Sequence, residues 1–425
     1  MANPLSSLPR RLSARPTRPR GNDLHDGPPS AVVAVKKIFA AETGTFFVIL
    51  GTTLFLVVFG LVMVLSSSSV EQYVATKDFF GAFVRQGVFA AIGVPAMLVV
   101  SRVPVWAWKK YSWAILIAAV GLQLLTLSPL GYTSGGNRNW IRVGSFSAQP
   151  SEAVKLGLCL WMAMILVKKR DKLDDWRQVA VPLLPVVAIS LGLVVKGGDL
   201  GTTMIMLLLV VAAVFFAGVK LKFFIAPLLV LAVIVPVITS SASSRSTRIS
   251  AWLSGCANSS QYQDTCWQST HGMWALASGG LFGVGLGNSK AKWSWLPEAD
   301  NDFIFAIIGE ELGLIGACVV LALFIVLAVS FVKIIRRSKD AYVRIVTASV
   351  MAWIIGQAFV NIAVVLGLLP VLGVPLPLIS AGGSALILTL VGIGVVLSFA
   401  RHHESDDSPG QHSRIVLDER VGSLR

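Results

Sequence analysis

The sequence predicts an all-α, polytopic integral membrane protein with about ten transmembrane helices and both termini in the cytoplasm. Of its 425 residues, 55% are hydrophobic and only 14% are charged, and the mean hydropathy is +0.74. A soluble fold of this composition would leave too much apolar surface in water. The apolar residues also gather into runs of about 20, the length that an α-helix needs to cross about 30 Å of hydrocarbon.

Ten such runs follow one another along the chain. We expect membrane spans at about 45–65, 81–101, 112–131, 152–167, 179–195, 200–217, 221–239, 303–333, 344–367 and 376–400. The first run is too long for the apolar region of a cleaved signal peptide, so we expect it to remain as the first span.

Three regions follow from this pattern. Residues 1–43 are basic, with RRLSARPTRPRG and DGPPS, and are predicted to be a disordered tail. Residues 44–402 form the transmembrane domain, which includes a large extracytoplasmic loop at about 240–302, and 403–425 form a second tail.

The distribution of Lys and Arg predicts the orientation. One side of the membrane receives both tails and the loops with RVPVWAWKK, VKKRDKLDDWR, GVKLK and VKIIRRSKDAYVR, which together hold 26 of the 36 basic residues. The positive-inside rule places this side in the cytoplasm. The basic tail suits anionic membrane lipids, whereas charge alone does not make nucleic acid an expected partner.

Two cysteines lie in the predicted outer loop. Cys256 and Cys266 flank ANSSQYQDT, and on an oxidising face we expect a disulfide between them, the alternative being two free thiols. No His stands close to either cysteine, which disfavours a metal site.

The stretch WLPEADNDFIFAIIGEELGLIG, Trp295 to Gly316, places acidic residues before and inside an apolar run. Asp302 has two interpretations: a cap on the first turn of the helix, or a general base held at the outer membrane surface. Glu310 and Glu311 lie about 12 Å deeper at 1.5 Å per residue. Intramembrane carboxylates are usually paired or protonated, so for this pair we favour a structural polar network over catalysis.

The segment GGNRNWIRVGSFSAQPSEAVKL brackets Trp140 with Arg138 and Arg142. The tryptophan is either an interfacial anchor or, with the arginines, part of a site for a diphosphate and a sugar face, and the residues alone do not decide between these. Ser151 is a candidate N-cap of the fourth span.

Further cations gather on the same outer face, at Arg85, Lys196, Arg245, Arg248, Lys290 and Lys292. Either an anion binds there or some of these side chains snorkel from helix ends. HGMWALASGGLFGVGLGNSK fits no phosphate-binding fingerprint and favours a closely packed re-entrant or interfacial element. The prolines and glycines of GLLPVLGVPLPLISAGGSA break helix continuity, which membranes tolerate where backbone is buried or lines a cavity.

NRNWIRVGSFSAQPSE, GDLGT, SGGLFGVGLGNSK, LPEADNDFIFAIIGEELG and PLPLISAGGS, in this order, resemble the SEDS family, the polytopic peptidoglycan glycosyltransferases that include FtsW and RodA. LPEA in place of LPER and the basic tail favour the FtsW branch. The resemblance covers about residues 45–400. It implies a bacterial enzyme that polymerises lipid II, an undecaprenyl-diphosphate-linked disaccharide-peptide, on the outer face of the cytoplasmic membrane at the division septum.

The resemblance also implies roles for residues. The family's acid falls at Asp302, which would accept the proton of the acceptor hydroxyl. Where the family has PEAHTDF this chain has PEADNDF, so Asp300 adds a second acid that raises the pKa of either group by like-charge repulsion. The usual Tyr of SYGGS is Ala381 and the Thr of PVTG is Leu372.

We expect substrate to be bound by Arg85, Arg138, Trp140, Arg142, Lys196, Asp199, Arg245, Arg248, Lys292, Glu298 and Ser380. No cofactor is certain; a divalent cation such as magnesium or manganese is compatible with diphosphate chemistry, although no ligand set is legible. The implied partners are lipid II and the growing glycan strand, a class B penicillin-binding transpeptidase and other divisome proteins.

Two other functions remain open. Intramembrane Glu310 and Glu311 and a broken last helix also suit a lipid II flippase, and a catalytically idle scaffold for a transpeptidase is the third possibility. The polar motifs gather outside while the inner loops are short and basic, which favours the enzyme.

Overall fold

The structure is a computed structural model of the chain, and it describes residues 44–134, 136–144, 146–224, 243–256, 266–293 and 295–405. Its helices are α2 (Gly44–Thr76), α3 (Gly81–Val100), α4 (Val105–Leu125), α5 (Pro150–Lys168), α6 (Trp176–Lys196), α7 (Leu200–Phe216), α9 (Ser243–Leu253), α11 (Trp267–Ser278), α12 (Ile304–Arg337), α13 (Ala341–Val365) and α14 (Gly383–Ser405). A small sheet is formed by β1 (Gly131–Ser134), β2 (Asn137–Val143) and β3 (Phe146–Ala148).

Nine of the ten expected spans correspond to helices. Within the described residues, seven helices are long and apolar enough to cross a membrane, and α7 is a shorter apolar helix. The seventh expected span, 221–239, lies outside the described residues from 225 onward. The chain is therefore a multi-pass membrane protein, and the total of ten spans stays a prediction.

Three expected spans differ clearly from their helices. The first was expected to end at about 65, whereas α2 continues to Thr76. The third was expected at 112–131, but α4 begins directly after Pro104 and ends at Leu125. The helix extends across Lys109 and Lys110 because Lys109 pairs with Asp340 at 2.6 Å and a lysine in a first turn can reach the interface. The tenth was expected from 376, but α14 begins at Gly383, after a proline-containing segment that is not helical.

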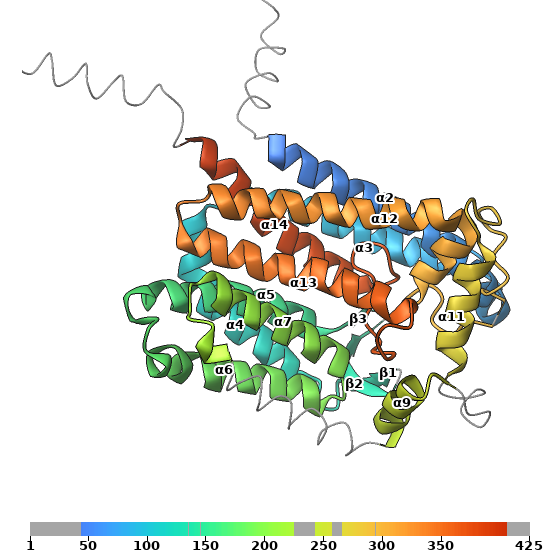
Figure 1. Cartoon of the computed structure of the whole chain (residues 1–425), viewed down its shortest axis with the longest axis horizontal. Helices are drawn as coiled ribbons and strands as arrows, with labels where there is room; N and C mark the ends of the chain where they lie inside the picture. Colours follow the sequence, from blue (N-terminus) through green and yellow to red (C-terminus); the bar gives the residue numbers. More distant parts are fainter. Residues whose placement is uncertain are drawn as a thin grey trace, which may run out of the picture. The chain divides into compact units, whose positions relative to one another are not determined.

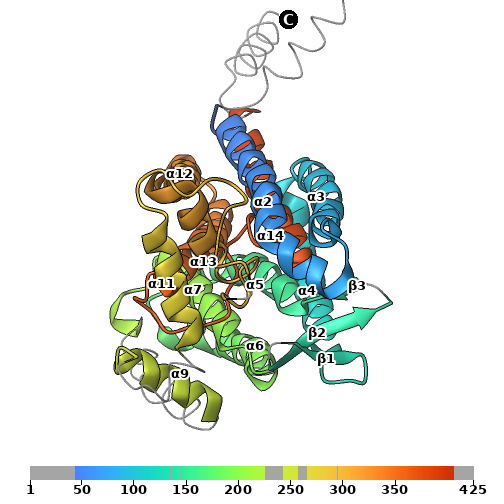
Figure 2. The same cartoon turned by 90° about the vertical axis from the view of Figure 1, so that its right-hand side faces the viewer.

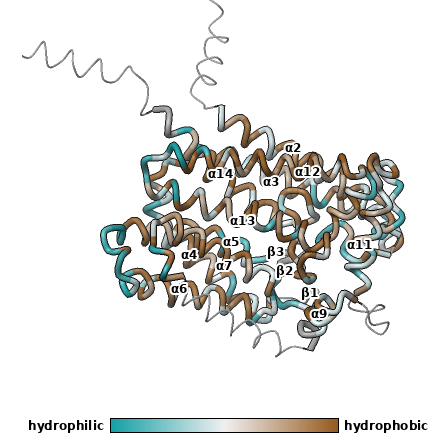
Figure 3. Tube along the Cα trace, in the orientation of Figure 1, coloured by the Kyte–Doolittle hydropathy of each residue, from teal (hydrophilic) through white to brown (hydrophobic). Residues whose placement is uncertain are grey.

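The helices pack on one another through apolar side chains. α3 lies along α14, α4 along α5, α7 along α13, and α12 contacts both α13 and α2 (Figures 1 and 2). α5 and α13 form the centre, where Trp161 and Trp353 are fully buried. Apolar residues run along the helices and polar residues gather mainly in the connecting segments (Figure 3).

The three-stranded antiparallel sheet connects α4 to α5. It was not predicted, because its strands are short and lie in a segment whose glycines and polar residues suggested only a loop. Gly131 pairs with Ile141 and Tyr132 with Trp140, and Arg142 pairs with Ser147 on the other edge of β2. The sheet thus turns a loop at the outer end into a rigid platform.

Helix α12 is interrupted at Gly313, whose φ of 68° and ψ of −168° are not helical. The break leaves backbone groups without helical partners, and the segment after α11 satisfies them. The amides of Val284 and Gly285 donate to the carbonyls of Glu310 and Glu311, both at 3.0 Å, and the amide of Leu314 donates to the carbonyl of Gly280 at 2.9 Å. The Gly-rich segment is a closely packed element that replaces the missing hydrogen bonds.

The two glutamates next to the break lie in a buried polar network. Glu310 accepts hydrogen bonds from the Ser289 hydroxyl and, at 2.8 Å, from the Lys290 amide. Glu311 accepts from the Ser66 hydroxyl at 2.7 Å and pairs with Lys292 at 3.3 Å. Both carboxylates have partners, which is the structural role favoured from the sequence.

In the described part of the outer segment between α7 and α12 lie two short helices, α9 and α11. A disulfide joins Cys256, just after α9, to Cys266, just before α11, with their Cα atoms 5.9 Å apart. Residues 257–265 between them lie outside the described residues.

A pair of glycine substitutions tests the packing of the Gly-rich segment that hydrogen-bonds to the backbone at the break in α12. Gly283 has a φ of +80° and an added Cβ would overlap the Glu311 carbonyl, whereas Gly280, with a φ of +55°, has open space around the same position. Gly280→Ala should cost only the left-handed backbone strain, about 1 kcal/mol. Gly283→Ala should cost about 1 to 3 kcal/mol more, seen as a lower Tm of the purified protein. Equal Tm values for the two variants would contradict this packing.

Candidate functional site

Asp302 lies in a turn immediately before α12 and is 8% exposed. The turn is closed by the amides of Asn301 and Phe303, which donate to the carbonyl of Glu298 at 3.1 and 3.2 Å. Glu298 adopts a φ of 56°, which is unusual for a residue other than glycine. The N-cap position of α12 is Phe303 and no side chain caps the helix, so the interpretation of Asp302 as a helix cap is wrong.

The backbone around Asp302 is held by residues from far along the chain. The Ala381 amide donates to the Asp300 carbonyl at 2.9 Å, and the Ser380 hydroxyl donates to the Asn301 carbonyl at 2.7 Å. The Asn361 side chain donates to the Asp302 carbonyl at 2.7 Å and also to the Val374 carbonyl at 2.7 Å. Three successive carbonyls are thereby held by α13 and by the segment before α14.

The carboxyl group itself has much less support. Its Oδ1 is buried and has no hydrogen-bond partner among the described residues. Gly373, with a φ of +68°, approaches the other oxygen so closely that an added Cβ would lie 3.5 Å from it. A buried carboxylate with an unused acceptor is costly to ionise, and it is free to take a proton from a bound molecule.

The pKa of Asp302 is raised to about 7, mainly by burial and next by the charges of Glu298 and Asp199, with a smaller rise from Asp300 and an opposing effect of Arg248. Burial also raises the pKa of Asp300, to about 6, with Glu298 and Glu71 adding to the rise and Arg85 opposing it. Both acids therefore titrate near neutral pH. Asp302 is the stronger base of the two at this site.

Asp199 is the N-cap of α7. Its Oδ1 accepts from the Thr202 amide at 2.8 Å and its Oδ2 from the Gln149 side chain at 2.9 Å. The Gln149 amide in turn donates to the Ser384 hydroxyl at 3.0 Å. Both oxygens of Asp199 are occupied, so this predicted substrate-binding residue orders the site and contributes negative charge near Asp302.

Ser380 is used in a similar way. Its hydroxyl donates to the Asn301 carbonyl and accepts from the Leu376 amide at 2.8 Å, and its own carbonyl accepts from Gln86 at 2.9 Å. It is 4% exposed. Ser380 therefore holds the turn that carries Asp302, and its expected contact with substrate stays a prediction.

The predicted cations do not all lie in one place. Arg248 and Arg85 are exposed and close enough to Asp302 and Asp300 to affect their pKa values. Lys292 is 5% exposed and is paired with Glu311, so it is not among the exposed cations, and its expected contact with substrate stays a prediction. The side chain of Arg245 lies outside what the structure describes.

The remaining cations lie around the sheet. Arg138, Trp140 and Arg142 share one face of β2, because alternate residues of a strand point the same way. The Arg142 guanidinium lies 4.4 Å from the centroid of the Tyr132 ring, and Tyr132 and Trp140 are 6.4 Å apart. The Arg138 amide donates to the Gly197 carbonyl at 2.8 Å, which brings the sheet to the turn that follows exposed Lys196.

A second polar cluster lies within the helices. Lys155 pairs with Glu152 at 2.8 Å and donates to Gln357 at 3.0 Å, and Gln357 donates to the Pro375 carbonyl at 3.0 Å. Ser151 does not cap α5, because the N-cap is Gln149 and the buried Ser151 hydroxyl has no partner among the described residues.

Three residues that order the polar groups of the site were not singled out from the sequence, namely Asn361, Gln357 and Lys155. Each is a polar side chain inside an apolar run, and such residues are costly in a membrane unless they have a role. A polar residue inside an apolar run could have marked them in the sequence. Their partners could not have been identified in this way, because they come from distant segments of the chain.

Carboxylates gather at this end, yet the residues that the structure describes contain no group of three or more His, Cys, Asp or Glu placed to hold a metal ion.

The fold and the buried carboxylate at one end define a class of polytopic membrane protein in which a polar outer site is built on apolar helices. The model of the cell cycle protein family of FtsW, RodA and SpoVE matches residues 47–405, and the chain belongs to this family.

Relatives and solved structures are consistent with this assignment. The chain is 38% identical to the "Probable peptidoglycan glycosyltransferase FtsW" of Mycobacterium tuberculosis, over 84% of this chain and 68% of that protein. It is 37% identical to stage V sporulation protein E of Bacillus subtilis, over 82% of this chain and 95% of that protein. The fold resembles the crystal structure of Thermus thermophilus RodA, with a TM-score of 0.61, 24% identity and coverage of 84% of this chain and 97% of that one.

The raised pKa of Asp302 has a consequence for stability. An acid whose pKa rises from 3.8 to about 7 on folding destabilises the protein increasingly as pH rises through that interval, because the folded state holds a proton that the unfolded state releases. The cost is about 2 kcal/mol at about pH 5.5 and about 4 kcal/mol at about pH 8. Asp302→Asn removes it, so the variant should gain about 2 kcal/mol more over wild type at the higher pH.

Thermal unfolding of both proteins at the two pH values measures this difference. If the Tm of Asp302→Asn exceeded that of wild type by the same amount at both pH values, or fell below it increasingly as pH rises, Asp302 would already be ionised at low pH.

Proposed function

We propose that this chain is a peptidoglycan glycosyltransferase that polymerises lipid II on the outer face of the cytoplasmic membrane. The observation that carries the proposal is the Asp302 carboxyl, which is buried, has one oxygen without a partner among the described residues, and has a pKa of about 7. A base whose pKa lies near the working pH is the most effective proton acceptor. The FtsW relatives, which are named as peptidoglycan glycosyltransferases, support the same activity.

The reaction requires one proton acceptor and a stabilised leaving group. The hydroxyl oxygen of the acceptor forms a bond to the anomeric carbon of the donor, while the bond from that carbon to the diphosphate oxygen breaks. The hydroxyl proton passes to the Asp302 carboxylate, and the prenyl diphosphate leaves. Displacement from the opposite face inverts the anomeric centre.

Exposed cations suit the diphosphate charge that develops on the leaving group. Arg248 and Arg85 lie within electrostatic reach of the two acids, and Arg142 and Lys196 extend the basic surface around the sheet. Trp140 offers a partly exposed aromatic face on the same strand as Arg142. We assign substrate binding to this surface and positioning to Asp199 and Ser380.

The flippase alternative depends on polar groups that line a path through the membrane. Glu310 and Glu311 have hydrogen-bonding partners within the protein. The non-helical segment before α14, the last helix, is held by hydrogen bonds from the Ser380 hydroxyl to the Asn301 carbonyl and from the Ala381 amide to the Asp300 carbonyl. Both features that suggested transport are therefore accounted for by structure.

The further proposal is that the chain works at the division septum with a class B penicillin-binding transpeptidase. One solved structure with this fold, at a TM-score of 0.68 and 24% identity, is described as "Structural coordination of polymerization and crosslinking by a peptidoglycan synthase complex". Septal placement follows the FtsW names of the relatives. A fluorescent fusion that spread evenly around dividing cells would contradict septal placement.

Purified protein in liposomes with labelled lipid II distinguishes the three functions, because the product is polymer, flipped monomer or neither. Asp302→Asn should reduce the polymerisation rate by at least about 100-fold, the usual contribution of a general base. Asp300→Asn is the matched control, since it removes the adjacent acid and should retain most activity. A class B transpeptidase added to the liposomes should raise the wild-type rate. Polymerisation by Asp302→Asn at a rate near that of wild type would contradict the assignment of Asp302 as the general base.

The pH dependence of the rate gives a test that does not remove the base. Only ionised Asp302 accepts a proton, so the rate should rise with pH through about 7 and then level off. Glu298→Gln removes a charge that raises the pKa of Asp302 and should move this rise to lower pH, while Arg248→Gln removes a charge that lowers it and should move the rise to higher pH. Shifts in the same direction, or none, would assign the profile to another group.

A further inference from the structure

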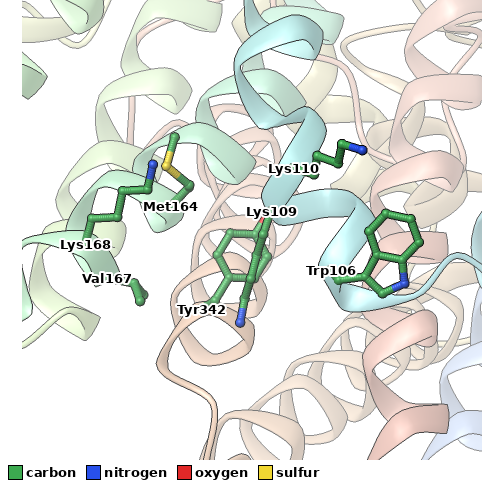
Figure 4. Close-up of a pocket in the computed structure, with 7 residues that line it drawn as sticks. All are labelled: Trp106, Lys109, Lys110, Met164, Val167, Lys168 and Tyr342. Carbon is green, nitrogen blue, oxygen red and sulfur yellow. The ribbon is translucent and has the colours of Figure 1, made fainter.

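A pocket lies at the end of the helices opposite to Asp302. It has a volume of about 370 Å³ and is formed by the start of α4, the end of α5 and the start of α13. Figure 4 shows Met164, Val167 and Lys168 of α5 on one side, Trp106 and Lys110 of α4 on the other, and Lys109 with Tyr342 of α13 between them. None of these residues takes part in the site at the outer end.

The pocket combines apolar walls with a cationic rim. Met164, Val167, Tyr342 and the ring of Trp106 supply the walls, and Trp106 is 61% exposed. Lys109, Lys110 and Lys168 supply the rim. An occupant that matches both parts has an apolar body and a negatively charged head.

The charge of the rim is only partly compensated within the protein. Lys109 is paired with Asp340 at 2.6 Å and its ammonium lies 5.4 Å from the centroid of Tyr342. The Lys110 ammonium lies over the rings of Trp106 and Tyr111, 6.0 and 5.4 Å from their centroids. Among the described residues, neither Lys110 nor Lys168 has a carboxylate partner. About two positive charges are left for a ligand.

The position of the pocket identifies which leaflet supplies the ligand. Lys109 and Lys110 lie in the basic segment RVPVWAWKK, and Lys168 is the second residue of VKKRDKLDDWR. The positive-inside rule assigns both segments to the cytoplasmic side. Basic pockets between helices on this side suit phospholipid head groups, and the cytoplasmic surface carries the negative potential that attracts them.

We propose that this pocket binds an anionic phospholipid of the cytoplasmic leaflet. Lys110 and Lys168 contact its phosphate, and the first part of an acyl chain lies against Met164, Val167 and Trp106. Free phosphate shares the head-group chemistry, but it would leave the apolar walls unfilled. The bound lipid joins the ends of three helices, two of which, α5 and α13, carry Lys155 and Gln357 of the buried polar cluster.

The test measures lipid binding to the purified full chain in neutral detergent. The concentration dependence of Tm is followed with dioleoylphosphatidylglycerol, dioleoylphosphatidylcholine and inorganic phosphate, and native mass spectrometry counts retained lipid. A ligand that binds only the folded protein raises Tm. We expect phosphatidylglycerol to raise Tm and to be retained, and the other two probes to do neither.

Charge and shape are then varied separately. Lys110→Gln with Lys168→Gln should weaken phosphatidylglycerol binding about 20-fold to 30-fold, since each lysine near an anionic surface contributes about a factor of five. Lys110→Arg with Lys168→Arg keeps the charge and should retain binding. Val167→Trp fills the pocket without changing charge and should reduce binding.

Arg336→Gln with Arg337→Gln is the matched control, because it removes two exposed charges from the end of α12 outside the pocket. This variant should bind phosphatidylglycerol as wild type does. Equal weakening by the control, unchanged binding by the lysine-to-glutamine variant, or the same rise in Tm with inorganic phosphate would overturn the proposal.

Discussion

The carbonyls of Asp300, Asn301 and Asp302 accept hydrogen bonds from the Ala381 amide, the Ser380 hydroxyl and the Asn361 side chain. These bonds join the turn before α12 to α13 and to the segment before α14. Because they use the backbone of the turn, they fix its position while leaving the Asp302 carboxyl free. A charge with no fixed partner can be kept in a buried position only if the surrounding backbone is fully satisfied.

The segment that leads into this turn is held at the break in α12. The helix leaves its regular path at Gly313, and the segment around Gly283 supplies the missing backbone partners. Glu310 and Glu311 lie at this break and bind Ser289, Ser66 and Lys292. The chain then continues from Lys292 into the turn that carries Asp302. The buried glutamates thus act on the site by holding the segment that leads to it.

Composition and apolar run length were sufficient for the fold class, because both depend on residues close together in the chain. They located nine helices and marked Asp302, and they indicated that the Gly-rich segment packs closely. They did not reveal the sheet, whose strands are short, or the start of α14 at Gly383. They also did not indicate that Lys292 pairs with Glu311, a partner that is identified only in three dimensions. The contact between Ser66 and Glu311 spans 245 residues, and no local pattern encodes such a pair.

The central claim is that Asp302 is held buried so that it titrates near neutral pH. Infrared difference spectra of wild-type protein minus Asp302→Asn, recorded across a pH series, observe the carboxyl directly. The account predicts that the carbonyl band of a protonated acid is present below about pH 6 and disappears with a midpoint near the pKa of about 7. A carboxylate band that is already complete at about pH 5 would show an ordinary solvated aspartate and would contradict the account.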